Sequence, residues 1–169
     1  MVLPLVAVPA RGQSPHQHGP GGADPQPHQR VEACERDFEQ VVADGRGAGL
    51  AFAADQNGYA GPLHVLELKD RLHLTAEQEA RMRTLLEAMF AESRPRAAKL
   101  ADGEARLRRL FATGRADDGV VRAAVADAER ARAEVRLAHL LTHLRTHDLL
   151  TEEQRRTYQQ LRWGTAAQP

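Results

Sequence analysis

The chain of 169 residues has few of the residue types that mark several protein classes. It has a single cysteine, Cys34, which excludes an internal disulfide framework, and only 4% of its residues are aromatic. Lys plus Arg and Asp plus Glu both number 23, so no net charge attracts nucleic acid or an anionic membrane. No segment approaches the roughly 20 apolar residues of a membrane span. We therefore expect one modest domain, with no nucleic-acid partner and no membrane span.

The signatures of common catalytic sites are also missing. The sequence has no nucleophile elbow, no Gly-rich phosphate loop, no His-Glu-x-x-His and no Cys-x-x-Cys. The protein is therefore predicted not to be an enzyme and to require no cofactor, so its function should depend on a surface.

The first third of the chain is predicted to be mostly irregular. Residues 1–10 form a short apolar run that resembles a signal-peptide remnant without its basic start, which favours export. Residues 11–29 are rich in Gly, Pro and His and are predicted to be flexible, with weak metal capture by His16 and His18 as the alternative. Residues 30–61 are predicted as a short helix and an irregular connection. Cys34 is interpreted as a half-buried small residue or as a cross-link between chains.

Apolar periodicity predicts helices from residue 62 to 163, followed by a tail over 164–169. A short helix over 62–73 precedes a long helix that Thr75 caps, and Pro95 is predicted to bend or break that helix. A break at 113–119 reverses the chain into a second long helix over 120–148, and Thr151 caps a last short helix to 163. The predicted fold is all-α, a long bent antiparallel helical hairpin with short flanking helices. Its apolar stripes exceed what two helices cover, so a homodimer is expected.

The pentapeptide Leu-Thr-x-x-Gln occurs twice, as residues 74–78 and 150–154. A threonine followed three residues later by glutamine fits a capping box, in which each side chain bonds the backbone amide of the other. Each copy precedes a predicted helix, so the pattern predicts two helix starts. The predicted cap residues are Leu74, Thr75, Gln78, Leu150, Thr151 and Gln154.

These two motifs resemble those of the Spy/CpxP family of bacterial periplasmic proteins, over about residues 62–163. That family includes ATP-independent chaperones, an inhibitor of an envelope-stress sensor kinase, and metal sensors and metal-resistance proteins of the CnrX and ZraP types. The resemblance implies a periplasmic location and a dimeric cradle. It also implies unfolded client proteins or a membrane-anchored sensor protein as partners.

Three histidines, His139, His143 and His147, lie four residues apart along one predicted helix face. Neutral imidazoles at this spacing can bind one transition metal, whereas packing or helix capping is the alternative interpretation. The resemblance to CnrX-type sensors implies additional ligands on the preceding helices. The candidate ligands for Zn, Cu, Ni or Co are His64, Glu87, His139, His143 and His147.

Apolar and basic residues alternate on the first long helix, a pattern that fits weak binding of unfolded clients, although a solvated helix face is the alternative. The leading hypothesis is a non-enzymatic periplasmic chaperone or envelope-stress modulator. A heavy-metal sensor or metal-resistance protein is the first alternative, and a helical dimeric adaptor without metal or client is the second. The candidate client-binding residues are Met89, Arg94, Arg96, Arg106, Leu107, Arg108, Arg109 and Phe111.

Overall fold

The computed structural model describes residues 40–41, 44–47 and 49–164, and this part of the chain is helical with no strand. The predicted all-α fold is thereby confirmed. Several predictions fall outside the described residues: the signal remnant, the His16 and His18 pair, Cys34, most of the first short helix and the residues after 164.

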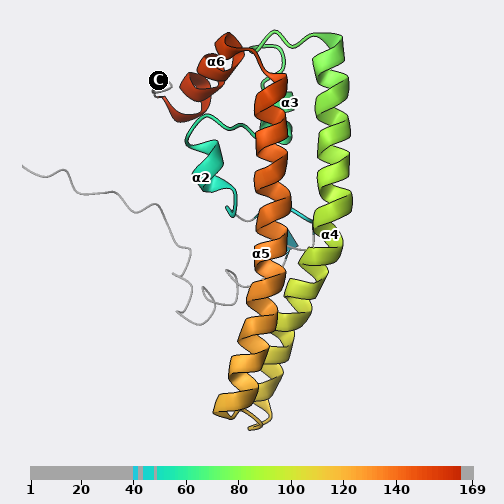
Figure 1. Cartoon of the computed structure of the whole chain (residues 1–169), viewed down its shortest axis with the longest axis vertical. Coiled ribbons are helices and arrows are strands. Elements are labelled where there is room, and N and C mark those ends of the chain that lie inside the picture. Colours follow the sequence, from blue (N-terminus) through green and yellow to red (C-terminus); the bar gives the residue numbers. More distant parts are fainter. Residues whose placement is uncertain (1–39, 42–43, 48, 165–169) are drawn as a thin grey trace, which may run out of the picture.

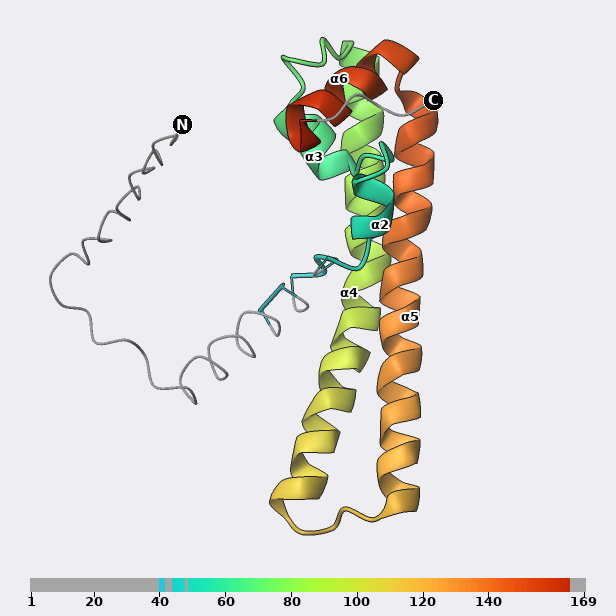
Figure 2. The same cartoon turned by 90° about the vertical axis from the view of Figure 1, so that its left-hand side faces the viewer.

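Two long antiparallel helices, α4 (Ala76–Ala112) and α5 (Asp118–Leu149), form the predicted hairpin (Figures 1 and 2). Asp117 begins α5 by accepting a hydrogen bond from the Val120 amide at 2.9 Å. The turn that joins α4 to α5 lies at one end of the hairpin, and three short helices lie at the other end (Figure 1). They are α2 (Phe52–Asp55), α3 (Pro62–Glu67) and α6 (Glu152–Trp163). The prediction missed α2, and α3 is shorter than predicted because the chain turns after Glu67.

Helix α4 continues through Pro95 and changes direction along its length, as both views show. Proline lacks an amide hydrogen and crowds the preceding turn, so a bend is the expected response. Pro95 leaves the Ala91 carbonyl without its amide donor, and the Arg96 guanidinium donates to the next carbonyl, that of Glu92, at 2.7 Å. Of the two predicted outcomes, the helix bends and does not break.

The seam between α4 and α5 is built from small and medium apolar residues. Gly103 allows a close approach, because a Cβ there would lie 3.1 Å from the Ala128 Cα. A second buried cluster lies among the short helices at the other end of the hairpin. The seam cluster contains Ala97, Leu100, Ala128, Ala131 and Val135, and the second cluster contains Ala60, Val65, Leu72, Met82, Leu150 and Tyr158.

The outer face of α5 carries leucines that this chain leaves uncovered. Leu137, Leu141 and Leu144 are 55%, 38% and 49% exposed, and their spacing puts them on one helix face. They belong to the apolar stripes that the sequence predicts to exceed what two helices can cover. Phe111, near the hairpin turn, is 63% exposed.

Candidate functional site

Both predicted capping boxes form. The Thr75 hydroxyl accepts from the Gln78 amide at 3.1 Å, and Gln78 Oε1 accepts from the Thr75 amide at 3.0 Å. Thr151 and Gln154 make the same pair of bonds at 3.2 and 2.9 Å. The two boxes begin α4 and α6, as predicted. Leu150 is buried and Leu74 packs against the same cluster, so the motif leucines anchor both helix starts.

The two motifs also bind each other, which local sequence reasoning missed. Gln78 Nε2 donates to Gln154 Oε1 at 2.8 Å, and Gln154 Nε2 donates to Gln78 Oε1 at 3.0 Å. The same two amides donate across the molecule to the carbonyls of Leu149 and Leu72. The residues are 76 positions apart, so only the repetition of the motif itself could have suggested this pairing.

The three histidines at positions 139, 143 and 147, here called the histidine ladder, contact the chain segment that precedes α3. His139 is 4% exposed, and its Nε2 lies 3.1 Å from the carbonyl oxygen of Gly45. The buried Ser93 hydroxyl on α4 donates to the same oxygen at 2.9 Å. A Cβ on Gly47 would lie 3.1 Å from His139 Nδ1, so this face of the ring is covered as well.

The other two histidines of the ladder, His143 and His147, contact Tyr59 and the nearby Gly61. His143 Nδ1 lies 2.6 Å from the Tyr59 carbonyl oxygen, and a Cβ on Gly61 would lie 2.8 Å from His143 Nε2. The His147 ring stacks on the Tyr59 ring with 4.4 Å between their centroids. The ladder therefore packs against the backbone and side chain of an earlier segment. His139 and His143 bond carbonyls of that segment and not the last carbonyls of α5, which helix capping would require.

Burial lowers the pKa of His139, and the charge of His143 lowers it further, while the hydrogen bond to Gly45 opposes the shift. Burial also lowers the pKa of His143, and its hydrogen bond to Tyr59 and the nearby Asp55 carboxylate oppose that shift. Both rings are therefore held neutral at pH 7. A neutral imidazole that donates one proton to a carbonyl suits each of these contacts.

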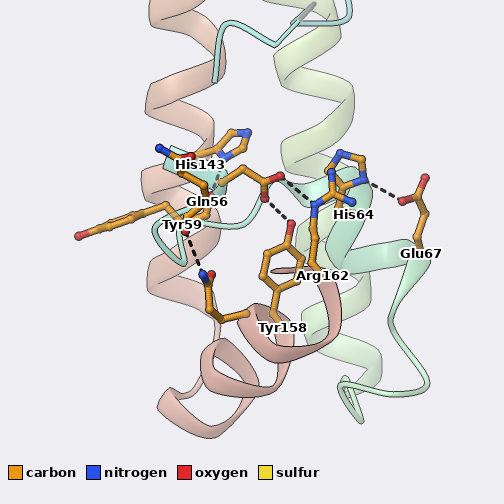
Figure 3. Close-up of polar contacts among 9 residues, drawn as sticks. Gln56, Tyr59, His64, Glu67, His143, Tyr158 and Arg162 are labelled. Carbon is orange, nitrogen blue, oxygen red and sulfur yellow. Dashed lines mark hydrogen bonds and ion pairs between the residues drawn. The ribbon is translucent and has the colours of Figure 1, made fainter. Parts of the chain in front are cut away.

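A polar cluster around the buried Asp55 ties α2 to α6 (Figure 3). Its carboxylate accepts from the Tyr158 hydroxyl and from Arg162 Nε, the latter at 2.8 Å. Burial and the bond to Asp55 raise the pKa of the fully buried Tyr158. Gln159 Nε2 adds a bond to the Gln56 carbonyl at 2.9 Å. No sequence pattern pointed to this cluster, because its halves lie more than 100 positions apart.

A pocket of ≈ 470 Å³ lies between the segment before α3, the histidine ladder, α4 and α6. Phe52 and Trp163 meet edge to face in its wall, with ring centroids 5.4 Å apart. Charged and polar side chains are interspersed with the apolar ones, which is the usual composition of a binding pocket. Its lining includes Phe52, Met89, Phe90, Trp163, Arg46 and Arg162.

The structure does not bring the five candidate metal ligands together. His64 pairs with Glu67 at 2.8 Å, and Glu87 is exposed on α4. The nitrogens of His139 and His143 either bond a carbonyl or face a glycine. Within the described ranges, no group of three or more His, Cys, Asp or Glu is placed to hold a metal ion. In this arrangement the residues do not fit a metal ion, and metal binding stays a prediction.

The candidate client-binding residues are spread along α4. Met89 is buried in the pocket wall, and the Arg94 guanidinium lies 5.0 Å from the centroid of Phe90 beside it. Phe111 lies 22 residues further on, about 33 Å along the helix. Between them, Arg96 forms an ion pair with Glu92, and Arg106 forms one with Asp127. Leu107 packs against the seam cluster, whereas Arg108 and Arg109 are exposed. The predicted set therefore forms two separate regions.

The fold and this site define a class of small helical-hairpin proteins in which two Thr-Gln caps bond each other through their glutamine side chains. A family model described as LTXXQ motif family protein matches residues 62–162. The chain belongs to this family, which comprises Spy/CpxP-like periplasmic proteins. No curated protein and no solved structure matches the chain. None of the helices in the described part of the chain is long and apolar enough to cross a membrane.

Proposed function

We propose that this chain is a non-enzymatic periplasmic protein that holds partly folded polypeptides without ATP. The observation that carries the proposal is the pocket between the segment before α3, α4 and α6, with Phe52, Met89, Phe90 and Trp163 in its lining. An apolar client side chain would leave water on entering it, and each half-buried aromatic ring contributes about 1 kcal/mol. Contacts of this size are weak enough to be released without an energy source.

The bonding of the pocket's titratable groups supports a binding role over a catalytic one. Asp55 is held by Tyr158 and Arg162, and Glu67 is paired with His64. The two buried histidines are bound to carbonyl oxygens. A general base or nucleophile needs a lone pair directed at a substrate. The carboxylates of Asp55 and Glu67 direct theirs at protein partners, and the second ring nitrogen of each buried histidine faces a glycine.

The metal-sensor hypothesis remains the alternative. It requires the backbone at Gly47 and Gly61 to move away from His139 Nδ1 and His143 Nε2, because these are the ring nitrogens that do not bond a carbonyl. Calorimetric titration with zinc, copper, nickel and cobalt tests it, with a His139→Ala/His143→Ala variant as the reference. Tight binding by the wild type that this variant loses would favour the sensor.

An aggregation assay with a chemically denatured client tests the chaperone proposal. The wild type at stoichiometric concentration should suppress aggregation, and a Phe52→Ser variant should suppress it roughly fivefold less well, because about 1 kcal/mol of apolar contact is lost. Phe52 is 53% exposed, so its replacement should leave the core intact.

Phe111→Ser is the matched control, since Phe111 is also exposed but lies near the hairpin turn. We expect this variant to act like the wild type. If Phe111→Ser loses suppression while Phe52→Ser keeps it, clients bind at the distal region of α4 and not at the pocket. No suppression by the wild type would overturn the chaperone proposal.

We infer also that the protein is a homodimer. Leu137, Leu141 and Leu144 form a contiguous apolar face on the outside of α5, and helix faces of this kind usually meet a partner. A second copy of the chain would present the same face and satisfy a two-fold interface.

A further inference from the structure

One backbone carbonyl, that of Gly45, is held by both helices of the hairpin. Ser93 on α4 donates to it at 2.9 Å, and His139 on α5 lies 3.1 Å from it. Ser93 is fully buried and His139 is 4% exposed, so neither donor can turn to water in place of this carbonyl. A buried donor without an acceptor is costly, and the two side chains therefore require a carbonyl at this point.

The segment that supplies this carbonyl is recognised through its backbone alone. Gly45 has φ +73°, and a Cβ there would lie 2.8 Å from the Arg94 side chain. Gly47 touches His139 in the same way, with 3.1 Å from a Cβ to Nδ1. Any polypeptide that turns at a glycine at this point presents the same groups.

The four residues of this segment, 44–47, are held by hydrogen bonds and not by apolar side chains. Their sequence, Asp-Gly-Arg-Gly, has no apolar side chain to bury. The Arg46 side chain is 63% exposed, and its ion pair is with Asp44 of the same segment at 3.9 Å. Leu50, just beyond, packs against the seam cluster, so apolar anchoring resumes there. Segments with few apolar contacts open locally at low cost.

We propose that Ser93 and His139 form a binding site for a polypeptide backbone carbonyl, which Gly45 fills in the closed state and a client fills when it displaces residues 44–47. This inference rests on the proposed client-holding function. Arg46 and Gly47 line the pocket, so their departure opens it while the client backbone satisfies the two exposed donors. The client carbonyl takes the place of the Gly45 carbonyl, and the close approach at this point selects client turns that contain glycine.

Hydrogen exchange of the full-length chain, with and without reduced, carboxymethylated α-lactalbumin as an unfolded client, tests the displacement. Saturating client should increase exchange in residues 44–47. Unchanged or slower exchange there, with client demonstrably bound, overturns the proposal.

A pair of glycine variants tests the competition. Gly45→Ala should loosen the segment and bind the client about threefold tighter or more, because less of the protein is in the closed state. Gly114→Ala is the control: its φ of +64° gives similar backbone strain, but no atom lies within 4 Å of its Cβ position. Equal or weaker binding by Gly45→Ala overturns the proposal.

Adding Ser93→Ala to Gly45→Ala tests the donor itself, since the segment no longer competes in that background. The double variant should bind client more weakly than Gly45→Ala, and equal affinity would contradict a carbonyl site at Ser93. A wild type that binds no client overturns the proposed function. A wild type that binds while Gly45→Ala gains nothing overturns only the displacement.

Discussion

At the scale of single residues, the amide of Gln78 combines two roles that a carboxylate cannot. Its Oε1 caps the Thr75 amide, and its Nε2 donates to Gln154 and to the Leu149 carbonyl. A capping box alone accepts glutamate as readily as glutamine. The pairing of two boxes through their side-chain amides is therefore the reason that both motifs have glutamine.

Gln78→Glu should destabilise the fold by about 2–4 kcal/mol, because it removes two donors and puts a carboxylate against two acceptor oxygens. The helix cap itself is retained. The free energy of unfolding from urea titration, followed by circular dichroism, measures the effect.

Gln160→Glu, the same change at an exposed position of α6, is the control and should alter stability by less than about 0.5 kcal/mol. A Gln78→Glu variant as stable as this control would show that the reciprocal pair contributes nothing.

The buried histidines predict a stability that depends on pH. Burial lowers the pKa of His139 and of His143, so the unfolded chain binds more protons than the folded chain below the ordinary histidine pKa. Stability should be complete above that pKa and decrease as the pH falls through it, by at most about 1.4 kcal/mol per pH unit for each histidine. Asp55, His64 and Arg162 face His143 and modulate the loss.

Urea titrations between pH 7.5 and pH 5 measure this slope. A His143→Gln variant should have a shallower slope, whereas replacement of the exposed His73 by glutamine should leave the slope unchanged. If the wild type and His143→Gln respond equally to pH, proton uptake at this ring is not the cause.

At the scale of elements, Pro95 makes α4 bend while Ala97 and Leu100, one turn further, stay buried in the seam. An interior proline costs a helix about 3 kcal/mol, because the Ala91 carbonyl loses its amide donor and the ring crowds the preceding turn. The bend is therefore maintained by packing against α5.

Pro95→Ala should stabilise the isolated chain by about 1 kcal/mol or more, because the exposed site gains an amide donor and loses the clash. Thermal and urea unfolding measure the gain. A loss of stability would mean that the bent geometry is needed for packing at the seam.

Local signals allowed most elements to be predicted. Thr75, Thr151 and their glutamines act within four residues of themselves, so the starts of α4 and α6 were visible in the sequence. Pro95 and the break near Gly114 are equally local. The contacts of Gly45 with His139 and of Asp55 with Tyr158 join residues 94 and 103 positions apart, and no periodicity records such pairs.

The histidine ladder illustrates the same limit at a candidate site. Spacing predicted that His139, His143 and His147 share one face of α5, and they do contact one common segment. Spacing could not predict what that face meets. The glycines at 45, 47 and 61, which allow the backbone to approach the rings, were the available signal.

At the scale of the whole molecule, the two faces of α5 differ in what they bury. One face packs on α4 through alanines and Val135, and the other carries Leu137, Leu141 and Leu144 in contact with solvent. Among the described residues, no further helix covers that outer face at these leucines. Association of two chains through it is therefore expected.

The wild type should be a dimer by light scattering after size exclusion, and a Leu137→Ser/Leu144→Ser variant should be a monomer. Burial of these half-exposed leucines from two chains is worth about 4 kcal/mol, a factor on the order of a thousand in Kd. Val125→Ser, at a 43% exposed position on a different face of the same helix, should stay dimeric. A double variant that remains a folded dimer would place the interface elsewhere. Dissociation by Val125→Ser alone would place it near the hairpin turn.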